Sequence, residues 1–331
     1  MEYTPSSILQ GLHAKAKAGL PIVGVSTGIE ANCEEVGGVD FIAVHSSDRY
    51  RVAGSDSLGG FLAYGNANRV VCEMIPPLLQ TFPNIPVLAG VCGVDPFLLR
   101  RRLLDELLAL GVAGIQNHPT VGLIDGNFRK NLEETGMSFQ LEVELVAEAH
   151  ALGIFSAPFV FDRDQARMMA EAGADLLIAH PGLSPDATPT ASLDRHHLEY
   201  LDKFRRISHA AKSARDEVIV LGYSATLGDR DDLLSFLDQC PEADGYFETL
   251  SAARLGVDVS NFGRDQDRNP KPHDDATGKS MNAAYGDRPA NRPSASTQTT
   301  STRGLFPREG RGPVSASRLQ DISQIRLDDN D

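Results

Sequence analysis

The sequence predicts an α/β protein, a (β/α)8 barrel of the TIM type, followed by a disordered C-terminal tail. Before Phe262, eight short apolar segments rich in β-branched residues alternate with longer segments of helical periodicity. This alternation is typical of a parallel sheet covered by helices. Such a barrel needs about 250 residues, so the chain of 331 residues is long enough for one barrel and a further segment.

The predicted strands comprise residues 21–26, 41–45, 86–91, 113–117, 155–160, 176–180, 218–222 and 245–248. The predicted helices comprise residues 68–80, 96–110, 139–152, 164–172, 193–212 and 231–238. Three helices are followed by a glycine and then an apolar strand start, at Gly111, Gly153 and Gly173. A left-handed glycine ends a helix in this way. An open doubly wound sheet is the alternative, but no phosphate-binding glycine fingerprint follows the first strand.

Residues 263–331 have the composition of a disordered tail, so we expect domains at 1–262 and 263–331. Six prolines interrupt a run of Ser, Thr, Asn, Gly and Arg that holds few large apolar residues. Such a segment buries too little surface to offset the entropy lost on ordering. Its last apolar residues have a loosely helical spacing, so a short partner-docking helix is the alternative to a frayed end.

The charge of the chain is concentrated in the predicted barrel. The whole sequence has 31 Lys/Arg and 45 Asp/Glu, a formal net charge of −14, and the segment from Arg264 contains 11 and 10 of them. The barrel is therefore acidic, which argues against nucleic acid as a partner because a phosphate backbone would be repelled.

Composition also argues against a membrane or secreted protein. No apolar stretch approaches the roughly 20 residues that a membrane-spanning helix needs, and the first 20 residues lack the apolar core of a signal peptide. The four cysteines, Cys33, Cys72, Cys92 and Cys240, share no metal-type spacing. We therefore expect a cytoplasmic protein with reduced thiols.

Polar residues follow most of the predicted strands, where the active site of such a barrel lies. The segments concerned are 26–28, 45–47, 92–95, 117–120, 161–162, 180–182, 223–224 and 248–249. Two connections, 46–66 and 120–136, are longer than turns require. We interpret them as binding loops, with 120–136 as a lid over the site; inserted surface loops are the alternative.

Several long motifs lie between Ile8 and Leu183. They include GLPIVGVSTGIEANCEEVGGVDFI, SSDRYRVAGSDSLGGFLAYGNAN, PVLAGVCGVDPF and GVAGIQNHPTVGLIDGNFRKNLEETGM. On these motifs the chain resembles the phosphoenolpyruvate hydrolase-like family of TIM-barrel proteins, which is grouped with the phosphoenolpyruvate/pyruvate-binding barrels. The resemblance implies a small anionic substrate, phosphoenolpyruvate or a related 2-oxo acid.

The resemblance also implies functional positions in this chain. The substrate-binding positions are Ser26, Thr27, Gly28, Ser47, Arg49 and Ser57. The catalytic positions are Asp95, Asn117, Glu134 and His180. His45 and His118 also follow strands, but they replace other residue types of the family pattern and are ranked lower.

Enolate chemistry gives these side chains their expected roles. An enolate is stabilised by a divalent cation or by fixed donors, so we expect Mg²⁺ bound by Asp95. A loop carboxylate, Glu133 or Glu134, would be a further oxygen ligand, since only one of two adjacent residues can face inward. Asn117 would donate to the oxyanion, His180 would transfer a proton and Arg49 would hold a carboxylate or phosphate. The alternatives are an Asp95 that caps the helix after it, a structural His180, and a surface Arg49.

The second half of the barrel departs from the family pattern. Tyr223 and Glu248 stand in strand-end turns where the family has glycines, in the usual phosphate-binding region of this fold. Two functions therefore remain open. The first is a hydrolase or lyase acting on a small 2-oxo acid or enol phosphate, and the second is a catalytically weak barrel that binds a small anion or a protein partner in a regulatory role. Homo-oligomers remain an alternative to monomers.

Overall fold

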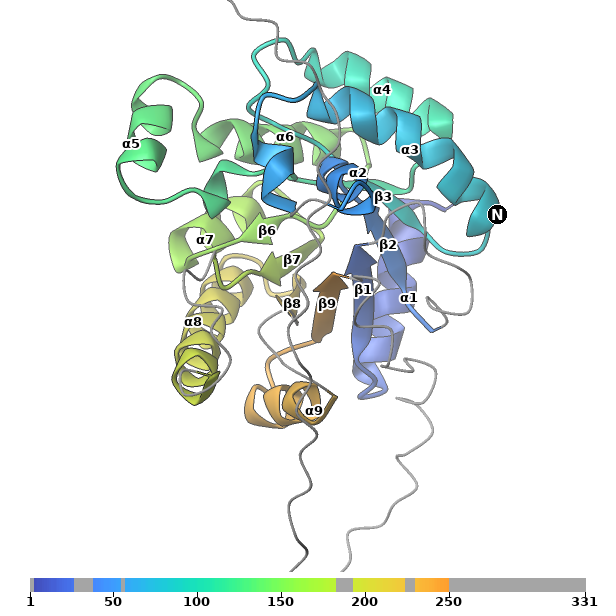
Figure 1. Cartoon of the computed structure of the whole chain (residues 1–331). Helices are drawn as coiled ribbons and strands as arrows, with labels where there is room; N and C mark the ends of the chain where they lie inside the picture. The colour runs from blue at the N-terminus through green and yellow to red at the C-terminus, as the bar shows by residue number, and fades with distance from the viewer. Residues whose placement is uncertain (1–2, 27–37, 55–56, 183–192, 224–229, 250–331) are drawn as a thin grey trace, which may run out of the picture. The chain divides into compact units, whose positions relative to one another are not determined.

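Helices surround a parallel sheet in the computed structural model, which describes residues 3–26, 38–54, 57–182, 193–223 and 230–249 (Figure 1). The predicted disordered tail, 263–331, lies outside these ranges. The strands are β1 Ile22–Ser26, β2 Phe41–Val44, β3 Val87–Gly90, β4 Gly114–Gln116, β5 Phe155–Ser156, β6 Phe159–Val160, β7 Leu176–Ala179, β8 Ile219–Tyr223 and β9 Gly245–Thr249. The helices are α1 Pro5–Lys17, α2 Ser46–Val52, α3 Ala67–Thr81, α4 Arg100–Leu110, α5 Gly126–Glu134, α6 Phe139–Ala151, α7 Arg163–Glu171, α8 Leu193–Ala214 and α9 Arg230–Gln239, with short 3₁₀ turns η1 Ser57–Phe61 and η2 Val121–Leu123.

The sheet closes on itself through the segment that contains β5 and β6. The strand order is β5-β4-β3-β2-β1-β9-β8-β7-β6, so β5 and β6 lie at its two ends, yet only Ala157 and Pro158 separate them in the chain. The Ala157 N–H donates to the Ile115 carbonyl (3.0 Å) on the β4 side, and the Pro158 carbonyl accepts from the Ile178 N–H (2.9 Å) on the β7 side. The predicted (β/α)8 barrel is thereby confirmed. The fifth strand, predicted as 155–160, is divided because Pro158 has no N–H to donate.

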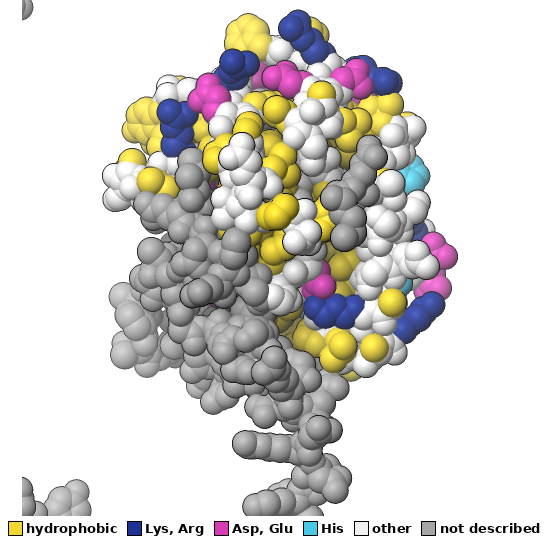
Figure 2. Space-filling model, turned by 90° about the vertical axis from the view of Figure 1, so that its right-hand side faces the viewer, with side chains coloured by type: hydrophobic (Ala, Val, Ile, Leu, Met, Phe, Trp, Pro, Cys, Tyr) yellow, Lys and Arg dark blue, Asp and Glu magenta, His cyan; other side chains and the backbone are white. Residues whose placement is uncertain are grey.

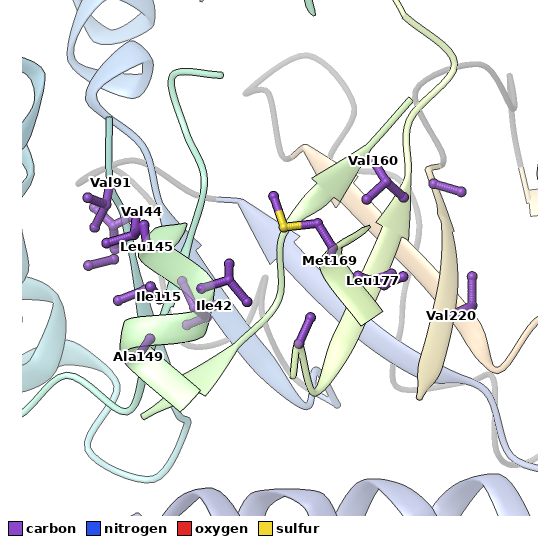
Figure 3. Close-up of a cluster of buried hydrophobic side chains, with 14 of the residues drawn as sticks. Ile42, Val44, Val91, Ile115, Leu145, Ala149, Val160, Met169, Leu177 and Val220 are labelled. Carbon is purple, nitrogen blue, oxygen red and sulfur yellow. The ribbon is translucent and has the colours of Figure 1, made fainter. Parts of the chain in front are cut away.

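Two layers of apolar side chains stabilise the barrel. Alternate strand residues point outward and pack against the helices; this layer includes Ile42, Val44, Ile115, Val160, Leu177 and Val220 against Leu145 and Ala149 of α6 and Met169 of α7 (Figure 3). The residues between them point inward, among them Phe41, Phe155, Phe159 and Phe247. This alternation with a period of two is what a strand buried on both faces requires.

The three glycines expected to end helices adopt the predicted conformation. Gly111, Gly153 and Gly173 have φ values of 95°, 67° and 93°. The residues after Gly111 and Gly173 each bond back to the preceding helix, with the Val112 N–H donating to the Leu107 carbonyl and the Ala174 N–H to the Met169 carbonyl. These bonds satisfy carbonyls that the helix end leaves open and direct the chain into β4 and β7.

One local expectation was wrong, and two long connections contain helices. The helix predicted from residue 96 begins at Arg100, because Asp95 and Leu98 close a turn first (Leu98 N–H to Asp95 carbonyl, 3.0 Å). The connections 46–66 and 120–136 contain helices α2 and α5 rather than irregular loops alone. In Figure 1, α5 lies at the edge of the view, and the lid role expected for 120–136 stays a prediction.

Charged side chains of both signs lie side by side on the face shown in Figure 2. Ion pairs also join exposed side chains one helical turn apart, Arg101 with Asp105 on α4 (3.0 Å) and Arg69 with Glu73 on α3 (3.5 Å). Among the described helices, none has both the length and the apolar composition that crossing a membrane would take.

Candidate active site

Three buried histidines gather at the carboxyl-terminal end of the barrel. His45, His118 and His180 directly or closely follow β2, β4 and β7, and each side chain is at most 8% exposed. The rings of His45 and His118 stack at 4.0 Å between centroids, and the ring of Phe159 lies 6.2 Å from His118 and 5.4 Å from His180. Parallel strands in a barrel bring their carboxyl ends to one mouth, which is why residues far apart in the sequence meet here.

His45 is held in a single neutral form by two neighbours. Its Nε2 lies 2.5 Å from Oε1 of Gln116, whose amide nitrogen donates to the Ala157 carbonyl (2.9 Å). Because that bond turns the amide oxygen toward His45, Nε2 carries the ring proton and Nδ1 accepts from the Ser26 hydroxyl (2.9 Å). Burial lowers the pKa of His45. Ser26, predicted to bind substrate, thus has its hydroxyl engaged by a histidine that the sequence interpretation ranked lower.

His180 is also neutral, and its donor nitrogen is defined. Its Nδ1 accepts from the Gly182 N–H (3.0 Å), so the proton resides on Nε2. Burial, followed by the nearby charge of Lys203, lowers the pKa of His180 to about 3. The Lys203 ammonium is held close by, donating to the Pro181 carbonyl (2.7 Å). The rings of Tyr223 and His180 lie 4.1 Å apart between centroids, so Tyr223 contacts the predicted catalytic histidine.

His118 differs from the other two because its ring makes no hydrogen bond to the residues that the structure describes. Its Nδ1 is buried without a partner. Burial, together with the positive charge of Arg51, keeps the pKa of His118 well below its ordinary value. A buried polar atom without a partner is costly, so this ring is the part of the cluster whose nitrogens are available to a ligand.

Asn117 and Glu142 form a second buried network beside the histidines. The Asn117 amide accepts from the Phe159 N–H (2.6 Å) and donates to the Phe159 carbonyl (3.2 Å) and to Glu142 Oε2 (2.6 Å). Glu142 also accepts from the Thr120 hydroxyl (2.7 Å) and the Val121 N–H (2.8 Å). Both amide hydrogens of Asn117 are therefore used within the protein, which suits a positioning residue better than an oxyanion donor.

The sequence interpretation did not single out Glu142. It lies on α6 between Phe139 and Val143, which face the core, so a charged residue on an apolar helix face was the signal that could have revealed it. Burial raises its pKa to about 7, although its three hydrogen bonds favour the charged form.

The Asp95 carboxylate is already engaged by three hydrogen bonds. Its Oδ2 accepts from Asn66 (2.9 Å) and Asn68 (3.2 Å), and its Oδ1 accepts from the Phe97 N–H (2.9 Å). Within the described ranges, no group of three or more His, Cys, Asp or Glu side chains could hold a metal ion. This donor set does not fit the Mg²⁺ expected at Asp95.

The remaining predicted site residues are dispersed. Ser47 is buried on α2, whereas Arg49 on the same helix is exposed and pairs with Glu73 at 3.2 Å. Glu134 is exposed in the last turn of α5. Ser57 begins η1, and Thr27 and Gly28 lie outside the described residues.

Comparison with known proteins identifies the relatives of this barrel. The phosphoenolpyruvate hydrolase-like family matches residues 7–262. The chain belongs to this family. A ToMV susceptible protein, tm-1(GCR26), and the ToMV resistance protein Tm-1(GCR237), both of Solanum lycopersicum, are each 40% identical to it over 253 residues. This match covers 76% of the chain but only 34% of either tomato protein.

Other members of the comparison are more distant. A putative transcriptional regulatory protein, y4pA, of Sinorhizobium fredii is 24% identical over 75% of this chain and 41% of its own length. Among solved structures, a putative lyase/mutase from Burkholderia cenocepacia is similar with a TM-score of 0.46 at 16% identity, covering 77% of this chain and 87% of that one. The chain spans well under half the length of the two tomato proteins and of y4pA.

Proposed function

We propose that this member of the phosphoenolpyruvate hydrolase-like family is an enzyme that acts on a small 2-oxo acid or enol phosphate by lyase or hydrolase chemistry. One observation carries the proposal, namely the three buried, neutral histidines around Phe159 at the carboxyl-terminal mouth. Catalytic residues of such barrels lie at this mouth, and the family name supports the substrate class.

His180 and His118 have different roles in this proposal. His180 donates its Nε2 hydrogen to the oxygen on which enolate charge develops, because a fixed neutral imidazole is a suitable donor to such an oxygen. His118 accepts or delivers the proton, since its Nδ1 has no protein partner. An anion bound beside the ring would raise the pKa of His118 toward neutrality. Asn117 positions the cluster through Phe159 and Glu142.

Turnover in two assays tests the proposal. Exchange of pyruvate methyl protons with D₂O, followed by NMR, reports enolisation, and pyruvate release reports phosphoenolpyruvate hydrolysis. We expect activity in at least one assay, with His180→Gln and His118→Phe each lowering it about 100-fold or more. His209→Gln, an exposed change on α8, is the matched control and should leave the rate unchanged. Full activity in both cluster variants would contradict the assignment.

A second function, a regulatory barrel without strong catalysis, is favoured by one contact. Tyr223 occupies a family glycine position and lies 4.1 Å from His180, where a substrate would have to approach the ring. The names of the relatives, a virus susceptible protein, a virus resistance protein and a putative transcriptional regulator, are in keeping with such a role. Pyruvate binding without turnover in either assay would support this second function over the first.

A further inference from the structure

Several buried polar atoms that make no hydrogen bond gather at one place in the described part of the chain. Five of them belong to α2 and to the histidine that follows β4: Ser46 Oγ, Ser47 Oγ, Asp48 Oδ1, Arg51 Nη1 and His118 Nδ1. Asp48 and Arg51 form an ion pair with each other, and further atoms of this kind, such as Ser156 Oγ and Ser208 Oγ, lie elsewhere. The side chains of Ser46, Ser47, Asp48 and His118 are at most 6% exposed, whereas that of Arg51 is 28% exposed. Folded proteins rarely leave so many buried groups unsatisfied together. We call these five residues the α2 cluster.

The members of the α2 cluster are neighbours. His45, the residue before α2, stacks on His118 at 4.0 Å. Arg51 Nη1 lies 3.5 Å from Asp48 Oδ1, and its charge is close enough to lower the pKa of His118. The turn η1 covers them, since Phe61 meets the edge of the His118 ring at 5.8 Å and a Cβ on Gly60 would lie 3.0 Å from that of Ser47.

The chemistry of the cluster defines its ligand. Two hydroxyls and a guanidinium offer hydrogen-bond donors, and an arginine binds a carboxylate through two parallel bonds. Asp48 already balances one positive charge, that of Arg51. The pair is therefore neutral overall, and burying a singly charged carboxylate beside it costs less than burying a doubly charged phosphate. An oxo or hydroxyl group next to that carboxylate would face His118.

We propose that Ser46, Ser47 and Arg51 bind the carboxylate of a small 2-oxo acid and place its oxo end against His118, beneath η1. The inference rests on the proposed function for its substrate class. It assigns the carboxylate to Arg51 rather than to Arg49, the position that the family resemblance implies. Arg49 points away, with a 57% exposed side chain that pairs with Glu73.

Binding of pyruvate to the full chain, measured by calorimetry, tests the subsite without requiring turnover. We expect pyruvate to bind at least ten times more tightly than inorganic phosphate. Arg51→Met and His118→Phe should each weaken pyruvate binding about 10- to 100-fold, the value of a charge-assisted hydrogen bond or two. Arg101→Met, an exposed and paired arginine of α4, should leave it unchanged.

A stability measurement distinguishes binding groups from structural ones. Because the Ser46 and Ser47 hydroxyls have no partner in the described protein, Ser46→Ala and Ser47→Ala should leave the Tm unchanged or raise it while weakening pyruvate binding. A lower Tm in both would show that the hydroxyls are structural and would overturn the proposal. So would an absence of pyruvate binding to the unaltered protein, tighter binding of phosphate, or a loss of affinity in Arg49→Met but not in Arg51→Met. Pyruvate binding through Arg51 without proton exchange or phosphoenolpyruvate hydrolysis would instead overturn the proposed function and leave the subsite standing.

Discussion

Replacing Glu142 by alanine is expected to lower the free energy of unfolding by about 4 kcal/mol, because three buried donors lose their acceptor at once. These donors are the Asn117 amide, the Thr120 hydroxyl and the Val121 N–H, at 2.6–2.8 Å from the carboxylate. Urea unfolding followed by circular dichroism measures the loss. Glu144→Ala on the same helix is the matched control. The Glu144 side chain is 43% exposed and pairs with Arg100 at the surface, so its removal should cost at most about 1 kcal/mol.

The same carboxyl group makes stability depend on pH in a defined direction. The pKa of Glu142 is about 7 in the folded protein and 4.5 for an ordinary glutamate. Between these values the folded state binds the extra proton, so the stabilisation that this group provides is complete below pH 4.5 and is lost as the pH rises through 7. Between pH 5 and 8 the native protein should lose about 2 kcal/mol relative to Glu142→Gln, which does not titrate. Parallel stability curves for the two proteins would show that Glu142 ionises normally.

The sequence predicted the barrel well because strands and helix ends are local signals. Each strand buried on both faces appears as a short apolar run, and Gly111, Gly153 and Gly173 mark helix ends by a conformation that other residues rarely adopt. Helices α1, α2 and α5 were not among the predicted helices. Helix α1 buries only Ile8 and Leu12, and neither α2 nor α5 has an apolar stripe. Helix α5 buries only Leu132, and the buried residues of α2 are polar.

The site was less predictable because it depends on relations across the barrel. His180 follows an apolar strand and could be singled out, but the stacking of His45 on His118 depends on how β2 and β4 are placed around the closed sheet. One sequence does not give that placement. For the same reason Asp95 was expected beside the substrate, although three hydrogen bonds hold its carboxylate in a turn before α4.

Replacing Gly245 by alanine is expected to disrupt barrel closure and to cost about 3 kcal/mol or more in the free energy of unfolding. Gly245 begins β9 and is the register partner of Ile22 in β1. A Cβ at this position would lie 2.0 Å from the Ile22 carbonyl oxygen and 2.5 Å from its nitrogen. These are backbone atoms of the neighbouring strand, so no side-chain rotation relieves the contact. Urea unfolding measures the cost.

Gly153→Ala separates this contact from backbone strain. Both glycines have positive φ, 153° at Gly245 and 67° at Gly153, but a Cβ on Gly153 would meet nothing within 4 Å. The Gly153 variant should therefore lose only about 1 kcal/mol, the cost of a left-handed alanine. If the two variants were equally stable, β9 would have to move away from β1 without cost. The five register pairs that join these strands, from Ile22–Gly245 to Ser26–Thr249, argue against that.

The same register pairs place Ser26 at the end of β1, where its hydroxyl donates to His45 Nδ1. Loss of β1–β9 pairing in Gly245→Ala should therefore disturb the histidine cluster as well as the fold.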